Sequence, residues 1–161
     1  MSKNIGVFVD TSDLYHKVRK QFNGKLCYEA YFEDIKELGN ISESFAYVMQ
    51  IEQEAKGFIN CLRSIGFTVR YKRPKIMRID DREVKRCDWG INISVDIIKK
   101  LDYINTVILG TTNSDFIPLI NWLKNQGINV IIFASSIPRS LKNVANKIIE
   151  ITEDHLEEET E

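Results

Sequence analysis

Ile5-Gly6-Val7-Phe8-Val9-Asp10 is a short apolar run that stops at an aspartate. A run that is apolar throughout, rather than alternating with polar residues, is typical of a strand buried on both faces of a parallel sheet. Two later runs, Thr106–Gly110 and Asn129–Ala134, have the same character. The segments between them have apolar residues at helical spacing. The chain therefore predicts an α/β fold, with three layers (α/β/α) and a mainly parallel sheet.

The other predicted elements complete this alternation. Gly39, Gly66 and Gly127 end three of the helices, because glycine favours the position after a helix. Helices are expected at residues 14–22, 28–38, 52–65, 88–101, 115–126 and 138–143, and further strands at 44–49, 67–71 and 148–151. Residues 72–86 are polar and charged, which predicts a hairpin or an exposed loop.

The length of 161 residues suits a single domain, expected at residues 1–151. No apolar run is long enough to span a membrane, and the N-terminal run is too short for a signal peptide. The three cysteines, Cys27, Cys61 and Cys87, are odd in number and widely spaced, which favours reduced thiols over disulfides or a zinc site. We therefore expect a cytoplasmic protein without a membrane partner.

The net charge of −1 hides an asymmetry between the body and the end of the chain. Residues 150–161 contain seven acids and no Lys or Arg, so the remaining 16 acids oppose 22 basic residues and residues 1–149 carry +6. We interpret residues 152–161 as a solvated acidic tail and the domain as mildly basic.

Acidic and polar clusters follow two of the predicted strands. Asp10-Thr11-Ser12-Asp13 follows the first, and Thr111-Thr112-Asn113-Ser114-Asp115-Phe116 follows the strand at 106–110. Either aspartate could simply cap a helix. However, the carboxyl ends of parallel strands meet at one edge of a sheet, and closely held carboxylates are costly without a cation. The two clusters together predict a divalent-metal site.

A third polar group lies on the helix expected at 88–101. Asp88, Asn92 and Asp96 are spaced by four and share one stripe, while Ile91, Val95 and Ile98 lie on the other side. Asp96 lies in an apolar stretch, where an uncompensated carboxylate is expensive to bury. A solvated polar stripe is the alternative interpretation.

The segment before that helix is basic. Residues 69–86 contain eight Lys and Arg against three acids. We predict that they bind nucleic-acid phosphates, with Tyr71 or Trp89 stacking an unpaired base; an ordinary charged hairpin is the alternative. The predicted phosphate-binding residues are Arg70, Lys72, Arg73, Lys75, Arg78, Lys85 and Arg86.

Together these motifs resemble the NYN domain family of PIN-like nucleases. That family has an Asp-x-x-Asn after the first strand, a Lys-x-x-Asp helix start with a further Asp eight residues on, and a Ser-Gly-Asp-Ser-Asp-Phe signature after a later strand. This chain has the corresponding segments Asp10-Thr11-Ser12-Asp13, Lys85-Arg86-Cys87-Asp88 continuing to Asp96, and Thr111-Thr112-Asn113-Ser114-Asp115-Phe116. The resemblance runs from about residue 5 to residue 150.

The resemblance implies a metal-dependent endonuclease acting on RNA. Its catalytic acids would be Asp10, Asp88, Asp96 and Asp115, around one or two Mg²⁺ or Mn²⁺ ions, with Asp13 and Asn113 as further metal ligands. Two positions depart from the family pattern, because Asp13 stands for its Asn and Asn113 for its first signature Asp. Either this exchange keeps the total negative charge of the site, or the loss of the acid at position 113 weakens metal binding and catalysis.

Other functions remain open at this stage. A non-catalytic RNA-binding or scaffold protein on the same fold is the main alternative, and Asn113 favours it. A von Willebrand A-type metal site would need a ligand at Leu14, and a haloacid-dehalogenase phosphatase would need an acid at Ser12. His16 is expected on the surface. A homodimer is a further expectation that the sequence leaves open.

Overall fold

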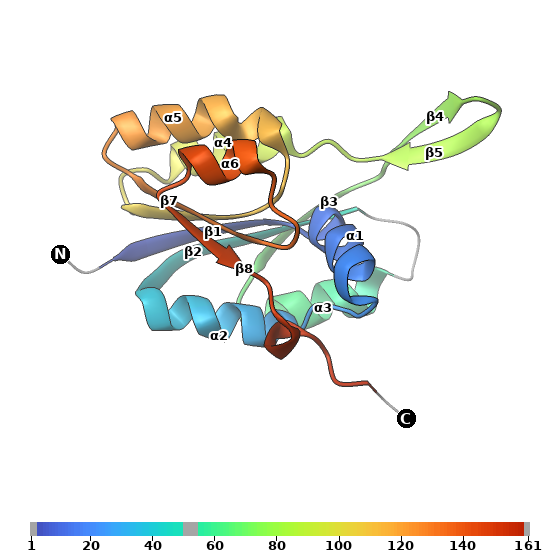
Figure 1. Ribbon diagram of the computed structural model, residues 1–161, viewed down its shortest axis with the longest axis horizontal. Coiled ribbons are helices and arrows are strands. Elements are labelled where there is room, and N and C mark those ends of the chain that lie inside the picture. Colours follow the sequence, from blue (N-terminus) through green and yellow to red (C-terminus); the bar gives the residue numbers. More distant parts are fainter. Residues whose placement is uncertain (1–2, 50–54, 160–161) are drawn as a thin grey trace.

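The structure is a computed structural model that describes residues 3–49 and 55–159. Its centre is a six-stranded sheet in the order β3-β2-β1-β6-β7-β8, and each neighbouring pair is parallel (Figure 1). These strands are β1 (Asn4–Asp10), β2 (Asn40–Met49), β3 (Thr68–Lys72), β6 (Thr106–Gly110), β7 (Asn129–Ala134) and β8 (Lys147–Glu150).

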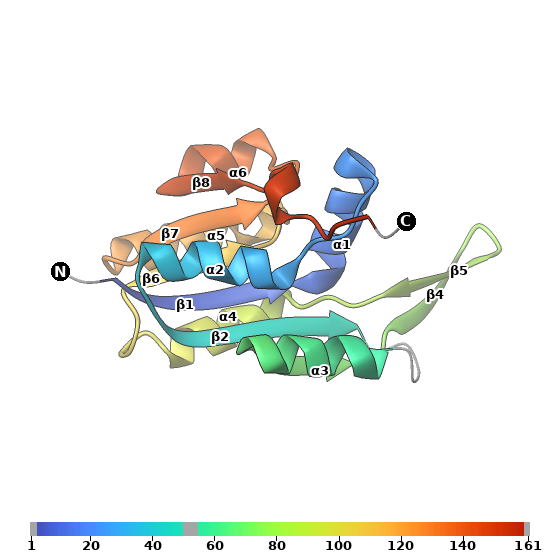
Figure 2. The same ribbon diagram turned by 90° about the horizontal axis from the view of Figure 1, so that it is seen from below.

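Helices cover both faces of this sheet. Figure 1 shows α2 and α3 below it and α4, α5 and α6 above it, and Figure 2 shows α1 beside the end of β1. The helices are α1 (Thr11–Phe22), α2 (Tyr28–Leu38), α3 (Ala55–Ile65), α4 (Gly90–Lys99), α5 (Ile117–Asn125) and α6 (Arg139–Val144). Short 3-10 helices are η2 (Ser114–Phe116) and η3 (Glu153–His155). The predicted three-layer fold with a parallel sheet is confirmed.

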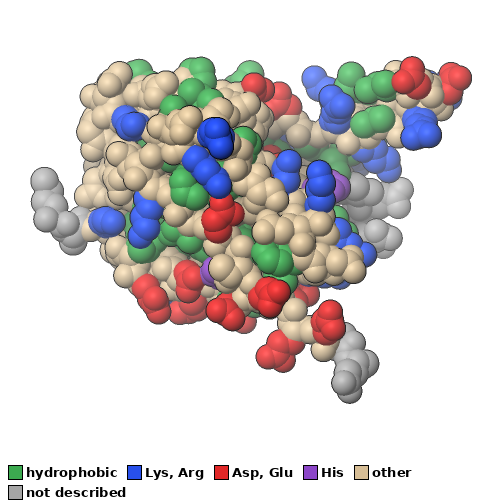
Figure 3. Space-filling model, in the orientation of Figure 1, with side chains coloured by type: hydrophobic (Ala, Val, Ile, Leu, Met, Phe, Trp, Pro, Cys, Tyr) green, Lys and Arg blue, Asp and Glu red, His purple; other side chains and the backbone are tan. Residues whose placement is uncertain are grey.

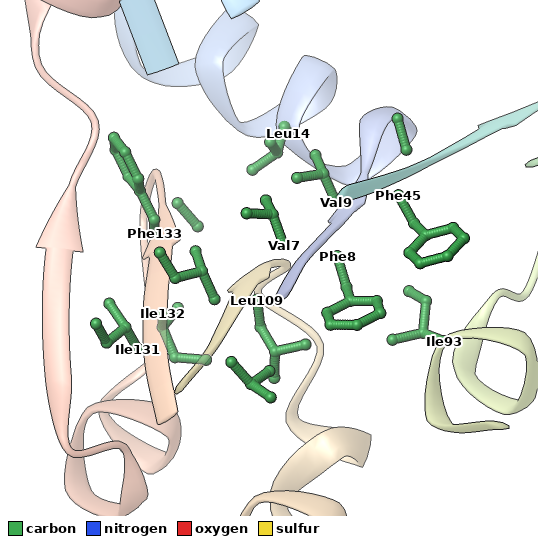
Figure 4. Close-up of a cluster of buried hydrophobic side chains, with 14 of the residues drawn as sticks. Val7, Phe8, Val9, Leu14, Phe45, Ile93, Leu109, Ile131, Ile132 and Phe133 are labelled. Atoms are coloured by element: carbon green, nitrogen blue, oxygen red, sulfur yellow. The ribbon is translucent and has the colours of Figure 1, made fainter. Parts of the chain in front are cut away.

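The core explains why β1 is apolar throughout. Val7 and Val9 point toward Leu14 of α1, whereas Phe8 points to the other face, toward Ile93 of α4 (Figure 4). All of these side chains are fully buried. The Phe8 ring also stacks on Phe45 of β2, with ring centroids 5.6 Å apart. A central strand covered on both faces needs apolar residues at consecutive positions, because its side chains alternate between the faces.

Gly110, the last residue of β6, lies in a tight space. A Cβ atom there would meet the Tyr31 hydroxyl oxygen at 2.8 Å and both Val9 methyl carbons at 3.1 Å. Tyr31 belongs to α2, and its hydroxyl donates a hydrogen bond to the Phe133 carbonyl oxygen of β7 at 2.8 Å. The end of β6 is therefore packed against a helix on one face of the sheet.

The predicted hairpin is a two-stranded arm that projects from the domain (Figures 1 and 2). It consists of β4 (Lys75–Ile79) and β5 (Arg82–Arg86), which pair antiparallel. Asp80 and Asp81 form its turn, with φ of 52° and 60°. Positive φ at both central residues is typical of the tight turns that match the twist of a hairpin. In the described part of the chain, the arm pairs with no strand of the main sheet.

Several boundaries differ from the prediction. β2 begins at Asn40 rather than at 44. α4 begins at Gly90 rather than at 88, with Trp89 as its N-cap. The helix expected at 52–65 is α3, and the part of that prediction before Ala55 lies outside the described residues. The first two and last two residues of the chain are also outside them. The described helices include none that is long and apolar enough to cross a membrane.

Residues 152–159, which we expected to be a solvated tail, begin with a packed segment. His155 is buried, and its Nε2 contacts Asp34 Oδ2 of α2 at 2.5 Å. The Cys27 backbone N–H donates to the His155 carbonyl oxygen at 2.7 Å, and the Glu157 N–H donates to the Lys25 carbonyl oxygen at 2.8 Å. The acids that follow, Glu158 and Glu159, are exposed.

Candidate metal and nucleic-acid site

The polar clusters that follow β1 and β6 lie where the order of the sheet reverses. β1 and β6 are neighbours, and Val9 pairs with Gly110 in the register. Chain connections run outward from this pair in opposite directions, through β2 to β3 on one side and through β7 to β8 on the other. Open α/β sheets bind ligands in the crevice at such a switch point, beyond the carboxyl ends of the strands.

Asp10 begins the site as the N-cap of α1. Its Oδ1 accepts a hydrogen bond from the Asp13 backbone N–H at 3.2 Å, which satisfies a free donor of the helix start. The pKa of the Asp10 carboxyl is raised to about 6, mainly by burial and also by the nearby carboxylates of Asp13 and Asp88, against the lowering effect of the backbone N–H groups of Asp13 and Ser12. Asp10 is therefore a largely desolvated carboxyl with two other carboxylates near it.

Asp13 joins α1 to the loop after β6. Its carboxylate accepts hydrogen bonds from the Thr112 backbone N–H at 2.7 Å and from the Thr112 hydroxyl at 2.9 and 3.0 Å. Thr111 supports the same loop, because its hydroxyl oxygen accepts from the Asn113 N–H at 3.2 Å. Asp13 thus fixes the position of the loop that carries Asn113 and Asp115.

Asp88, Asn113 and Asp115 line a common hollow of about 350 Å³, beside Ile91 and Val95 of α4. Asp88 Oδ1 accepts from the Gly90 N–H at 2.9 Å, and Asn113 Oδ1 accepts from the Asp115 N–H at 2.9 Å. Asp88 also acts on the pKa of Asp10, so it belongs to both groups of polar residues.

Asp96 has a different environment from the other predicted acids. It is only 7% exposed, and its Oδ2 accepts hydrogen bonds from the Tyr47 hydroxyl at 2.8 Å and from Arg70 Nε at 2.7 Å. Its Oδ1 accepts from a second Arg70 nitrogen at 3.0 Å. Asp96 therefore connects α4 to β3 through a two-point ion pair with Arg70, and to β2 through the hydrogen bond from Tyr47.

The outward face of α4 also differs from the expectation. Ile91, on the predicted apolar side, is 81% exposed, and Val95 and Ile98 are exposed as well. Ile93, Asp96 and Ile97 face the core instead. The helix buries the stripe that carries Ile93 and Ile97, and the ion pair with Arg70 makes Asp96 compatible with burial on that stripe.

The basic residues fall into two groups. Arg70 binds Asp96, and Lys72 Nζ donates to the Asp88 carbonyl oxygen and to Asn92 Oδ1 at 3.0 Å, 4.2 Å above the Trp89 ring. The second group is exposed and, among the described residues, its side chains form no ion pair or hydrogen bond: Arg73, Lys75, Arg78, Lys85 and Arg86.

The second group lies along the arm and at its base, and Figure 3 shows Lys and Arg side chains along the arm with acids toward its tip. Hydrophobic side chains lie between them, and Ile76 is 64% exposed. Of the two aromatic residues expected to stack a base, Tyr71 is half exposed, whereas Trp89 is 3% exposed and covered by Lys72. Only Tyr71 has a face that solvent reaches.

A family model for the NYN domain matches residues 4–152, nearly the whole described chain. The chain belongs to the NYN domain family. This membership places it in the PIN-like nuclease superfamily and indicates an RNA-related function with nucleic acid as partner.

Two similar proteins support the assignment. The NYN domain is 23% identical to the low amplitude and bright protein LabA of Synechococcus elongatus, over 92% of this chain and 84% of LabA. A crystal structure of a protein of unknown function from Vibrio parahaemolyticus has the same fold, with a TM-score of 0.85, 23% identity and 96% of both chains covered.

Two contributors to this NYN site are not evident from the sequence. Thr112 holds Asp13 through both its backbone and its side chain, and only the repeated threonine after β6 could have pointed to it. An aromatic hollow beside α1 is built from five separate segments of the described chain, so no local pattern predicts it. His16 is exposed, as expected for a surface residue.

Proposed function

We propose that this NYN domain is a metal-dependent endoribonuclease that hydrolyses phosphodiester bonds of single-stranded RNA. The observation that supports it most is the environment of Asp10, whose pKa rises to about 6 through burial and through the charges of Asp13 and Asp88. Carboxylates held at close range in this way favour a bound cation. They lie at the switch point, where α/β sheets bind their ligands.

Mg²⁺ or Mn²⁺ suits oxygen donors of this kind, and one or two of the carboxylates of Asp10, Asp88 and Asp115, with the Asn113 oxygen, would hold it. Within residues 3–49 and 55–159, no three His, Cys, Asp or Glu side chains are gathered into a ready metal cage. Mg²⁺ does not need one, because it keeps several waters and binds through one or two carboxylates plus substrate phosphates. When bound, such an ion lowers the pKa of a coordinated water and offsets charge on the phosphate.

Two further acids, Asp13 and Asp96, would position the groups that hold the metal. Asp13 would hold the loop 111–116 in register with α1, since it binds both the N–H and the hydroxyl of Thr112. Asp96 would fix α4, and with it Asp88, through its bonds to Arg70 and Tyr47. These two acids would therefore be positioning residues in this structure, rather than direct metal ligands.

The arm would supply the substrate contacts. Its exposed basic residues lack intramolecular partners in the described chain and are available to RNA phosphates. Arg73 and Arg86 lie where the arm joins β3 and the segment leading to Asp88, so phosphates bound there would extend toward the carboxylates. The opposite charges of arm and site suit a strand held by phosphates and cut at the metal.

A cleavage assay on end-labelled single-stranded RNA tests this proposal. We expect slow cleavage with Mg²⁺ or Mn²⁺, none with excess EDTA, and recovery when the metal is restored. Double-stranded RNA and single-stranded DNA of the same sequence serve as substrate controls. RNA binding without cleavage under any divalent metal would contradict the nuclease assignment.

A non-catalytic RNA-binding protein is the second candidate, and Asn113 favours it because an amide replaces a family acid at the metal edge. Asn113→Asp separates the two, since aspartate caps η2 as well as asparagine does. If Asp13 keeps the charge of the site, the change leaves cleavage similar or lowers it. Cleavage that rises from near zero would identify a weakened metal site. Binding without cleavage, unchanged in Asn113→Asp, would identify the binding protein.

A further inference from the structure

A second hollow of about 500 Å³ opens on the other side of the carboxyl edge, where β1 and β2 end. Its described lining comes from the start of α1 (Thr11, Ser12 and Tyr15), the start of α2 (Tyr28), the end of β2 (Met49) and α3 (Phe58). The volume is within the range of small-molecule sites, which is roughly 300–1,000 Å³.

Aromatic rings dominate this hollow. Tyr28 is buried and meets Phe58 edge-on, with ring centroids 5.6 Å apart. Tyr15 is 48% exposed, and its ring makes an edge contact with His16 at 5.4 Å. Ser12, His16, Lys25 and Glu157 also line the hollow and provide polar groups. A planar aromatic ligand with polar edges matches this combination of apolar surface and polar groups.

The hollow lies beside Asp10 of the carboxylate site. Thr11 and Ser12 follow Asp10 directly, and the Ser12 backbone N–H helps to lower the Asp10 pKa. Tyr28 is close enough to Asp10 for the carboxylate to add to the rise of the Tyr28 pKa, which burial dominates. A ligand in the hollow and a phosphate at Asp10 would therefore be neighbours.

We propose that this hollow receives one unpaired base of the RNA strand, from a nucleotide adjacent to the phosphate that is cut, with Tyr15 as its stacking partner. The inference rests on the proposed RNA function and adds a base-binding subsite to it. Proteins recognise single-stranded RNA by stacking splayed bases on aromatic side chains while a basic surface holds the phosphates. Because every base has a stacking face, the subsite selects unpaired RNA rather than a particular sequence.

The test measures binding in EDTA, where cleavage does not interfere. Single-stranded RNA decamers are prepared intact and with one abasic position moved along the strand, and each is titrated against wild type, Tyr15→Ala and Tyr15→Phe. Tyr103→Ala is the matched control, because Tyr103 is 64% exposed and precedes β6 at the opposite edge of the sheet. Thermal melting checks that each variant is folded.

We expect Tyr15→Ala to weaken binding of intact RNA by about 5- to 100-fold, whereas Tyr15→Phe and Tyr103→Ala leave it unchanged. One abasic position should weaken wild-type binding by a similar factor, and for that oligonucleotide Tyr15→Ala should have no further effect. RNA that binds wild type well, without dependence on any abasic position or on Tyr15, would overturn the subsite and leave the RNA function standing. Failure of wild type to bind any of the RNAs would overturn both.

Discussion

The switch-point site and the β4–β5 arm carry charges of opposite sign and are held in opposite ways. Asp10, Asp13 and Asp96 are each bound by groups from other segments or from a helix start. The basic side chains of the arm project into solvent, and its two strands pair only with each other in the described chain. Chemistry requires groups held within fractions of an ångström, whereas binding a flexible polyanion requires charge at the surface. Under the proposed function, the contrast would separate a rigid reaction site from an adaptable surface for RNA.

The largest expected effect comes from removing charge at the site. Asp10→Asn should lower RNA cleavage by about 100-fold or more, because a metal site loses a charged oxygen ligand. Cleavage rates with saturating Mn²⁺ measure this, and Asp102→Asn, an exposed acid before β6, is the control. RNA affinity in EDTA should not fall, because removing a negative charge near the RNA does not weaken phosphate binding. Unchanged cleavage would remove Asp10 from the metal site.

The second largest effect is expected on the free energy of unfolding, which should respond differently to substitutions in the two regions. Asp96→Ala should lower the free energy of unfolding by about 2–4 kcal/mol, because it leaves the Tyr47 hydroxyl and the Arg70 guanidinium without their acceptor. This loss is smaller than for a fully buried pair because the Arg70 side chain is 46% exposed, and water screens its charge. Arg78→Ala on the arm should change stability by less than about 0.5 kcal/mol. Urea titrations of both variants measure the difference, and equal values would contradict a rigid site.

The Asp10 pKa predicts a pH-dependent gain in stability for Asp10→Asn without metal. The folded state raises this pKa from 3.8 to about 6, so protonated Asp10 stabilises the fold fully below pH 3.8, and that contribution is lost as the pH rises through about 6. In EDTA the variant should therefore be more stable than wild type by about 1–3 kcal/mol above pH 7, with the advantage declining toward pH 4. Melting curves from pH 4 to 8 measure it. A constant difference across this range would show that Asp10 does not titrate there.

The smallest effect concerns single charges of the arm. Arg78→Ala and Lys85→Ala should each reduce the slope of log affinity against log salt by about one unit or less, because each removes at most one phosphate contact. Binding to single-stranded RNA at several salt concentrations gives the slope. Lys99→Ala, an exposed charge at the end of α4, should leave it unchanged. If the slope in all three variants equals that of wild type, the RNA does not bind at the arm.

The sheet could be predicted from the sequence because a strand that is buried on both faces needs apolar residues at consecutive positions. The runs at 5–9, 106–110 and 129–134 are apolar at every position or nearly so, and all three became central strands. The hairpin was also predictable, since charged residues flank the Asp80-Asp81 turn. In these segments, local composition and tertiary environment agree.

The environment of Asp96 could not be predicted from its own helix. Its burial depends on Arg70 and Tyr47, which lie on other strands and approach it only after folding. For the same reason, helical periodicity placed Ile91 on an apolar side without showing that this side meets solvent. The aromatic hollow is a similar case, because Tyr15, Tyr28 and Phe58 belong to three different helices. Sequence patterns report periodicity, whereas such sites depend on long-range contacts.

Gly110 sets a limit on how this site can evolve. A side chain there would collide with Tyr31 and Val9. Relief would require β6 to move or the Tyr31 hydroxyl to give up its bond to Phe133. Movement of β6 would displace the loop that Asp13 holds, so a side chain at position 110 would alter the carboxylate edge without touching any of its polar groups. Variation among relatives should therefore be narrow at position 110 and broad along the arm, where no packed neighbour restricts the choice of side chain.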